Sequence, residues 1–367
     1  MTPDVAPAHH GDRRDRLRAR VAAAELDALL VTDPVNVRWC SGFTGSNGQV
    51  LVRTDGDDDL LITDARYQAR AEAEAPDLDR VLRRDPVAVV IDELNAPFRL
   101  GFEAEHLSWD AGQRLRERIT GAGAAADPTT GEVEALRLVK DAHELAMLTE
   151  ACRLTTSALT WLLDEVVRPG ITEAELAQHL ERRFVELGAE RAAFDTIVAG
   201  GPNAAIPHHA PTDRPLAAGD ILTIDAGARY DGYHADCTRT VGIGHLDDHL
   251  REIHDLVRHA QAAGRAATVV GASGGDVDAA ARDLIEQAGY GEAFVHGTGH
   301  GVGLEIHEAP AVSRGATATL DAGMTLTVEP GVYLPGIGGV RIEDTVVVTA
   351  DGPATPLTDA PRELRLL

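Results

Sequence analysis

Hydrophobic and polar residues alternate along this chain with two different periods. In Arg13–Leu26, apolar positions recur at helical spacing among charged ones, which predicts an amphipathic helix. The continuous apolar run Ala28–Val31 predicts a buried strand, and the runs Gln49–Val52 and Leu60–Ile62 predict a hairpin. The same patterns predict three further elements: helices at Ala65–Ala75 and Trp109–Ile119 and a strand at Leu100–Phe102. The first third of the chain is therefore expected to form an α/β domain.

The composition changes after this region. Gly121–Pro128 is rich in Gly and Ala, so we expect it to connect the first domain to a second one. Asp141–Val167 then predicts a long amphipathic helix, and the capping box Thr172–Glu175 opens another helix that ends at Gly188. A length of 367 residues suits two domains of ordinary size, which we place at residues 1–130 and 131–367.

A predicted hairpin in the second domain carries two acidic residues. The strand-like run Ile221–Gly227 is followed by Asp231-Gly232, a dipeptide typical of a two-residue turn. That turn places Gly227 opposite Asp236 and puts Asp225 on the same sheet face as Asp236. Carboxylates this close repel each other unless cations lie between them, so the pair predicts a metal site. The alternative is a solvated hairpin with two surface acids.

Three more potential ligands follow. Glu329 ends a strand-like run just before a Pro-Gly turn. His300 lies in the glycine-rich segment Gly297–Gly303, whose small residues let backbone and metal approach closely. Period two puts Arg341 on the same strand face as Glu343, so we expect Arg341 to orient Glu343. Four carboxylates and one imidazole make an oxygen-rich site, which favours hard ions such as Mn(II) over a thiolate-type zinc site.

These residues lie in a series of linked motifs. The motifs are DAG at 225–227, YDGY at 230–233, ADCTRT at 235–240, HGTGHGVGL at 296–304, HE at 307–308, VEPG at 328–331 and VRIED at 340–344. Together they resemble the proline-specific metallopeptidases with the pita-bread fold, from about Leu138 to the end of the chain. Ser41–Asn47 and Thr63–Tyr67 resemble parts of that family's N-terminal domain. The resemblance implies an α/β domain like the creatinase/prolidase N-terminal domain, followed by an α+β pita-bread catalytic domain.

The resemblance also implies roles for the five ligand candidates. The implied ligands are Asp225 for one metal ion, His300 and Glu329 for the other, and Asp236 and Glu343 for both. A hydroxide held between two divalent cations would attack the scissile carbonyl, and Glu329 would carry a proton to the leaving nitrogen. Mn(II) is the expected metal, with Co, Zn or Fe as alternatives.

Further residues complete the implied pocket. His208 would hydrogen-bond the substrate or the tetrahedral oxyanion, and His307 would do similar work from the far wall. His296 would line the pocket that receives the proline ring. In a dipeptidase, Arg341 or a residue of the N-terminal domain would pair with the substrate carboxylate. The neighbouring His209 is expected to be a surface residue.

Composition restricts the partners. Asp and Glu total 59 against 34 Lys and Arg, and a net charge of −25 disfavours nucleic acid and anionic membrane surfaces. No apolar run suggests a signal peptide or a membrane span, so we expect a cytoplasmic protein without a membrane partner. Cys40, Cys152 and Cys237 lie far apart, which indicates neither a disulfide framework nor a thiolate zinc site. The family resemblance adds the expectation of a homodimer.

The predicted function is that of an Xaa-Pro aminopeptidase, a dinuclear-metal exopeptidase that cleaves the Xaa-Pro bond at the N-terminus of proline-containing peptides. Ser41–Asn47 resembles the aminopeptidases more than the alternative, an Xaa-Pro dipeptidase (prolidase), which closes the pocket beyond the proline. More distant alternatives are a creatinase-like amidinohydrolase, which does not need the metals, and a binding module that has lost catalysis. The presence of all five ligands counts against both.

Overall fold

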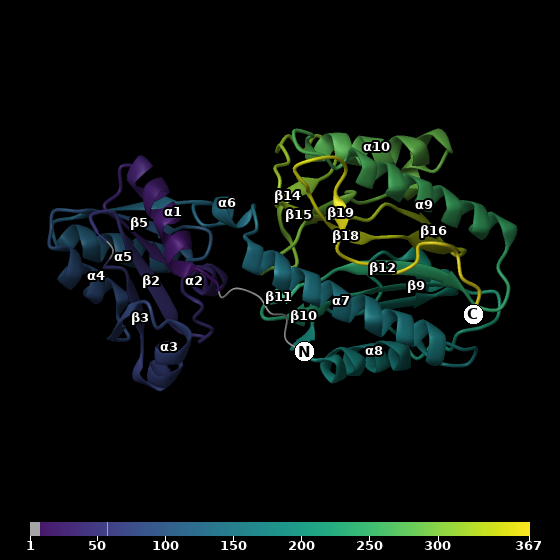
Figure 1. Cartoon of the computed structure of the whole chain (residues 1–367), viewed down its shortest axis with the longest axis horizontal. Coiled ribbons are helices and arrows are strands. Elements are labelled where there is room, and N and C mark those ends of the chain that lie inside the picture. Colours follow the sequence, from purple (N-terminus) through teal and green to yellow (C-terminus); the bar gives the residue numbers. More distant parts are fainter. Residues whose placement is uncertain (1–7, 57) are drawn as a thin grey trace. The chain divides into compact units, whose positions relative to one another are not determined.

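A computed structural model describes residues 8–56 and 58–367 of the chain. The described residues form two compact units, one ending at Arg137 and the other running from Leu138 to Leu367 (Figure 1). Each unit has its own buried hydrophobic clusters. Within the described ranges, no helix combines the length and the apolar composition that crossing a membrane requires.

The first unit is built from a sheet and helices. Its helices are α1 (His10–Ala23), α2 (Pro34–Ser41), α3 (Gln68–Glu74), α4 (Pro86–Leu94), α5 (Trp109–Gly121) and α6 (Glu134–Arg137), with a 3-10 turn, η1 (Ala65–Tyr67). Its strands are β1 (Ala28–Val31), β2 (Gly48–Arg53), β3 (Leu60–Thr63), β4 (Asp79–Leu82), β5 (Arg99–Glu103) and β6 (Ala125–Thr129). The strands described here form one sheet in the order β4-β3-β2-β1-β5-β6.

This sheet mixes parallel and antiparallel pairs, as an α/β unit with an inserted hairpin requires. β1 has the predicted bounds and pairs antiparallel with β2 and parallel with β5. α4 and α5 cover one face, where Val90 and Ile119 pack against Leu30 and Leu100. The predicted α/β class of this unit is confirmed.

One sequence prediction in this unit is wrong. The segment expected to be the exit linker contains most of β6, which pairs in parallel with β5. β6 is the edge of the sheet, and its free side tolerates Asp127 and Pro128, residues that a central strand would exclude. The edge position therefore explains why this strand has the composition of a loop.

The second unit contains the remaining elements. Its helices are α7 (Ala142–Glu165), α8 (Glu173–Leu187), α9 (Asp248–Ala267) and α10 (Gly274–Gln287), with 3-10 turns η2 (Gly201–Ala205) and η3 (Gly291–Ala293). Its strands are β7 (Arg191–Ala192), β8 (Ile197–Gly200), β9 (Ile221–Ala226), β10 (Ala228–Tyr230), β11 (Tyr233–His234), β12 (Cys237–Gly242), β13 (Gly299–Gly301), β14 (Glu308–Val312), β15 (Thr325–Val328), β16 (Gly331–Leu334), β17 (Gly338–Arg341), β18 (Asp344–Val347) and β19 (Thr355–Pro356). Both predicted long helices are confirmed, and the capping box of Thr172 and Glu175 opens α8 as expected.

The strands of this unit lie between two pairs of helices. Figure 1 shows α7 and α8 on one side of β9 and β12, and α9 and α10 on the other. The strand orders are β11-β10-β7, β12-β9-β8, β14-β13-β15-β18-β19 and β16-β17. This α+β arrangement confirms the second half of the predicted fold class.

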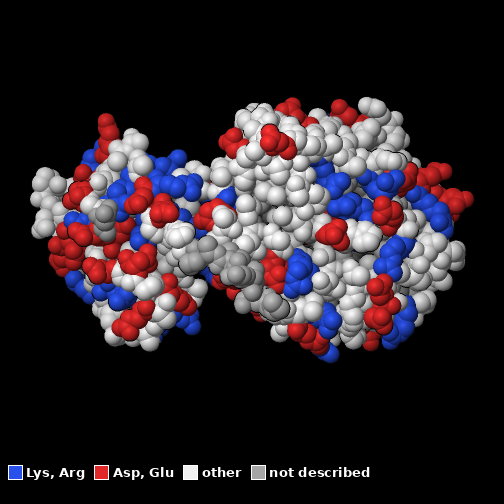
Figure 2. Space-filling view, in the orientation of Figure 1, with Lys and Arg blue, Asp and Glu red and all other residues white. Residues whose placement is uncertain are grey.

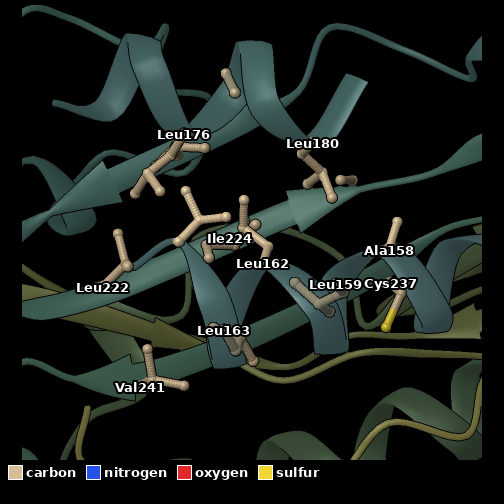
Figure 3. Packing of buried hydrophobic residues seen from close by; sticks show 14 of the residues in the cluster. Ala158, Leu159, Leu162, Leu163, Leu176, Leu180, Leu222, Ile224, Cys237 and Val241 are labelled. Carbon is tan, nitrogen blue, oxygen red and sulfur yellow. The ribbon is translucent and has the colours of Figure 1, made fainter. Parts of the chain in front are cut away.

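The alternation of β9 decides which way its acidic residue points. Leu222 and Ile224 pack among the leucines of α7 and α8 (Figure 3), whereas Ile221 belongs to the cluster that contains α9 residues. Successive strand residues face opposite sides, so Asp225 shares the face of Ile221. Cys237 belongs to the same buried cluster as Ile224, and its Sγ lies 3.8 Å from the Glu343 carbonyl oxygen.

The charged surface is mixed in sign on the face shown in Figure 2. Acidic and basic side chains are interspersed on both units in this view, with no large area of a single sign. Although the whole chain has a net charge of −25, this face presents no continuous acidic field.

Candidate metal centre

All nine site residues predicted from the sequence line a single cavity of about 850 Å³ in the second unit. They are His208, Asp225, Asp236, His296, His300, His307, Glu329, Arg341 and Glu343. The ligand candidates lie on or beside strands: Asp225 on β9, Asp236 before β12, His300 on β13, Glu329 after β15 and Glu343 between β17 and β18. Strand ends from separate sheets thus converge on one point.

The hairpin has the predicted register. Ala226 pairs with Cys237, the first residue of β12, so Asp236, the residue before that strand, lies opposite Gly227. A side chain at Gly227 would place a Cβ only 1.7 Å from the Ala235 carbonyl oxygen. Glycine at this position therefore allows the two strands to approach closely beside both acidic residues.

The segment around Glu343 differs from its prediction. The run Val340–Asp344 was expected to be one strand, but β17 ends at Arg341 and β18 begins at Asp344 in a different sheet. Arg341 therefore does not orient Glu343: its Nη2 donates to Asp225 Oδ2 at 2.7 Å. Glu343 Oε2 instead accepts a hydrogen bond from Thr238 Oγ1 at 2.6 Å.

The ligand atoms are close enough to share a cation. Asp236, His300 and Glu343 each offer an atom within 4.8 Å of the other two. His300 Nε2 lies 3.6 Å from Asp236 Oδ2 and 3.4 Å from Glu329 Oε1. His300 Nδ1 lies 3.0 Å from the Gly301 carbonyl oxygen, a contact that directs Nε2 toward the carboxylates.

Unsatisfied oxygens test whether a metal fits here. Asp225 Oδ1, Asp236 Oδ1 and Glu343 Oε1 are buried and have no hydrogen-bond partner among the described residues. An uncompensated buried carboxylate oxygen is costly, and a divalent cation is the group that most directly satisfies several at once. With one imidazole beside them, the donors suit a divalent ion that accepts oxygen and nitrogen ligands.

The raised pKa values of the clustered carboxyl groups also favour a bound cation. Burial, and then the charges of Glu343 and Asp225, raise the pKa of Asp236 well above its ordinary value. Burial, and then the charges of Glu329 and Asp225, likewise raise the pKa of Glu343 well above its ordinary value. Burial also raises the pKa of Glu329. These carboxyl groups repel one another, so bound cations would stabilise their ionised forms.

The structure adds two residues that sequence reasoning missed, Tyr333 and Thr238, both bonded to Arg341. Arg341 is buried, and its Nη1 donates to Tyr333 Oη at 2.7 Å, while its Nε donates to Thr238 Oγ1 at 3.2 Å. Tyr333 Oη also lies 2.8 Å from His296 Nε2. A hydrogen-bonded chain thus runs from His296 through Tyr333 and Arg341 to Asp225. Thr238 faces Asp225 across the hairpin, a signal that the predicted register already contained.

Of the neighbouring histidines His208 and His209, the second does not lie where the sequence predicted it. His208 is exposed in the cavity, whereas His209, expected at the surface, is buried. His209 Nε2 lies 2.9 Å from Glu173 Oε2. Glu173 also accepts hydrogen bonds from Thr212 Oγ1 at 2.6 Å and from Gly200 N at 2.8 Å. This buried carboxylate fixes the loop that presents His208.

His307 lies beside the ligand cluster. Its ring packs edge-on against His300, with centroids 4.4 Å apart. Burial, and then the neighbouring His300, lower the pKa of His307. Burial lowers the pKa of His300 as well, which favours the neutral imidazole that a metal ligand requires.

Comparison with known proteins gives matches over both units. The model of metallopeptidase family M24 matches residues 146–350, and that of the creatinase/prolidase N-terminal domain matches residues 13–139. An uncharacterized peptidase of Bacillus subtilis is 38% identical over 96% of this chain and 99% of its own length. An Xaa-Pro dipeptidase of Pyrococcus furiosus is 34% identical over 96% of this chain and 99% of its own.

Solved structures agree with these matches. A structure described as an Xaa-Pro dipeptidase from Bacillus anthracis is 39% identical, with a TM-score of 0.92 over 98% of this chain and 100% of its own. Another, described as an X-Pro aminopeptidase from Thermotoga maritima, is 34% identical, with a TM-score of 0.88 over 96% of this chain and 99% of its own.

Proposed function

The chain belongs to metallopeptidase family M24 and has a creatinase/prolidase N-terminal domain, and from this premise we propose that it hydrolyses the bond between an N-terminal residue Xaa and proline. The observation that carries the proposal is the cavity itself, in which unsatisfied buried carboxylates surround His300 beside His208 and His307. The relatives named Xaa-Pro dipeptidase support the substrate class.

The first candidate is an Xaa-Pro dipeptidase, because relatives of that name match the chain over almost its whole length. The second candidate is the Xaa-Pro aminopeptidase expected from the sequence, and one observation favours it. Arg341, the only arginine among the described residues that line the cavity, already donates to Asp225, Tyr333 and Thr238. It is therefore poorly available to pair with the terminal carboxylate of a dipeptide.

The proposed cofactor is a pair of divalent metal ions, with Mn(II) the first ion to test. Asp225, Asp236, His300, Glu329 and Glu343 would hold them. When bound, such ions supply Lewis-acid polarisation of the scissile carbonyl and activate water at neutral pH. Arg341 keeps Asp225 in place through the hydrogen bond at its Oδ2, which leaves Oδ1 free.

The remaining residues act on the peptide. His208 and His307 reach the cavity from different loops and would donate hydrogen bonds to the carbonyl oxygen as negative charge develops on it. Glu329 would hold a proton at Oε1 and pass it to the proline nitrogen as the bond breaks. His296, on the wall beside Tyr333, would contact the proline ring.

Product analysis on Ala-Pro and on Ala-Pro-Ala, with Mn(II) and again with chelator, tests the proposal. Cleavage of Ala-Pro without cleavage of Ala-Pro-Ala indicates a dipeptidase. Release of Ala and Pro-Ala from the tripeptide indicates an aminopeptidase. Both activities should disappear with chelator. Absence of cleavage on both peptides in the presence of several divalent metals would contradict the proposed function.

The remaining expectations rest on the family resemblance. We propose that the protein forms a homodimer and acts in the cytoplasm, and that catalysis resides in residues 131–367. Sedimentation analysis of the purified protein tests the first of these.

A further inference from the structure

Part of the cavity wall comes from elements that hold none of the metal-ligand candidates. α8 contributes Ala174, Ala177, Gln178 and Glu181. A spacing of three and four residues places these side chains on one helical face. The segment before β8 adds Phe194, Asp195 and Thr196 to the same cavity. We call these seven residues the α8 wall.

The α8 wall carries negative charge without a partner. Glu181 and Asp195 are exposed to solvent, and neither forms a hydrogen bond or an ion pair with the described part of the chain. Arg341, the one arginine that the described cavity lining contains, is buried and bonded to Asp225. Among the described residues that line the cavity, the two carboxylates therefore meet no compensating arginine or lysine.

A second feature of the wall indicates a polar ligand. Thr196 is only 3% exposed, and its Oγ1 has no hydrogen-bond partner among the described residues. A buried hydroxyl without a partner is uncommon and costs free energy unless a ligand or water reaches it. Thr196 lines the cavity next to Asp195, so this unsatisfied hydroxyl lies in the part of the wall that a bound polar group would contact.

The wall also has room for an extended aliphatic chain. Ala174 and Ala177 are the smallest residues on its helical face, and Phe194 provides an apolar surface beside them. Long basic side chains bury their methylene groups along such surfaces while their charged ends reach acidic groups. An apolar surface, a buried hydroxyl and exposed carboxylates on one wall together suit a lysine or arginine side chain.

We propose that the α8 wall is a subsite for a basic side chain, so that the enzyme prefers Lys or Arg as the residue before proline. The inference rests on the proposed function, because it names the substrate class that the same cavity accepts. The methylene groups lie on Ala174, Ala177 and Phe194, and the cation lies between Glu181 and Asp195. Acidic residues in the Xaa position are disfavoured by the same two carboxylates.

The test compares Lys-Pro with norleucyl-proline, whose side chain has a similar length and no charge. With the metal-loaded full-length protein, kcat/KM for Lys-Pro should exceed that for norleucyl-proline about three- to tenfold, the size expected of partly exposed ion pairs. The difference should appear mainly in KM and should shrink at about 0.5 M NaCl. In a double variant, Glu181→Gln with Asp195→Asn, the ratio should fall to about one.

Glu186→Gln is the matched control, because Glu186 is exposed on the same helix and does not line the cavity. Its ratio should equal that of the parent protein. A parent ratio of one or less, or an unchanged ratio in the double variant, would overturn the inference while norleucyl-proline is still cleaved. Failure to cleave all three peptides, Lys-Pro, norleucyl-proline and Ala-Pro-Ala, would instead overturn the proposed function and this inference with it.

Discussion

A single arginine links the hydrogen bonds around the candidate metal centre. Arg341 donates to Asp225, Tyr333 and Thr238, and lysine cannot reproduce this planar set of donors. We expect Arg341→Lys to weaken metal binding about 10- to 100-fold, the usual effect of losing a partner that orients a ligand. Metal titration with competing chelator measures this. An unchanged metal affinity, with a raised KM for Ala-Pro but not for Ala-Pro-Ala, would show that Arg341 binds the substrate carboxylate instead.

Asp236, in the carboxylate cluster, should be required for activity and yet destabilise the metal-free protein. Asp236 is buried beside Glu343 and Asp225 and has an oxygen without a hydrogen-bond partner. Asp236→Asn removes a ligand charge, so activity should fall more than about 100-fold, beyond the loss typical of an outer partner. The same change relieves repulsion in the metal-free protein, whose thermal midpoint should stay equal or rise.

Metal content and thermal unfolding, measured on the same metal-free and metal-loaded preparations, check both parts. Asp283→Asn on the exposed face of α10 is a suitable control. A strong loss of stability in the metal-free Asp236→Asn protein would mean that the carboxylate has a structural partner there.

At the scale of elements, one carboxylate ties the start of α8 to two neighbouring segments. Glu173 accepts hydrogen bonds from Gly200 N and Thr212 Oγ1 and lies beside His209, next to the catalytic candidate His208. Glu173→Ala should lower the free energy of unfolding by about 2–4 kcal/mol, because several donors lose their acceptor. It should also reduce turnover without removing metal, since His208 loses its support. Chemical denaturation and metal analysis test the two effects separately.

The pH dependence of this effect has a defined sign. Burial opposes ionisation of Glu173, but hydrogen bonds from Thr212, Gly200 and other donors prevail and lower its pKa below the ordinary value of 4.5. The folded state therefore favours the ionised form. Its stabilising contribution is complete above that ordinary value and is lost as pH falls through the lower pKa of the folded state. The stability difference between parent and Glu173→Ala should accordingly narrow below about pH 4. A difference that widens on acidification would contradict this assignment.

Elements with local signals were predictable from the sequence. β1 is a continuous apolar run, the capping box of α8 lies within four residues, and the turn at Asp231-Gly232 sets the register that pairs Asp225 with Thr238. Each signal depends only on residues that are close together in the chain, so it predicts the element without knowledge of the fold.

Features that depend on distant partners were not predictable in the same way. β6 is a strand because it pairs with β5, although its own residues are typical of a loop. Arg341 chooses Asp225 over Glu343 because the chain changes sheets between β17 and β18. His209 is buried because its ring contacts the buried carboxylate of Glu173, which is far away in the sequence. In all three cases tertiary contacts override the local pattern.

At the scale of the whole molecule, the two compact units should respond differently to metal. All nine candidate site residues belong to the unit from Leu138 to Leu367. Ligand that binds only the folded form stabilises by about 4 kcal/mol when its free concentration is 1,000 times its Kd. For a unit of this size, that corresponds to a rise of about 10 °C in thermal midpoint. Calorimetry should therefore show one transition that moves with Mn(II) and one that does not.

Two variants of the full chain assign these transitions. Leu30→Ala removes a fully buried side chain from the sheet of the first unit and should lower the metal-insensitive transition, since such changes cost about 2–5 kcal/mol. Asp236→Asn should leave both transitions insensitive to Mn(II). If the parent protein instead shows a single transition that moves with Mn(II), the two units unfold as one cooperative body. If only one of two transitions moves with Mn(II), the repulsion among the buried carboxylates destabilises the second unit alone. Metal binding then relieves that repulsion within this unit.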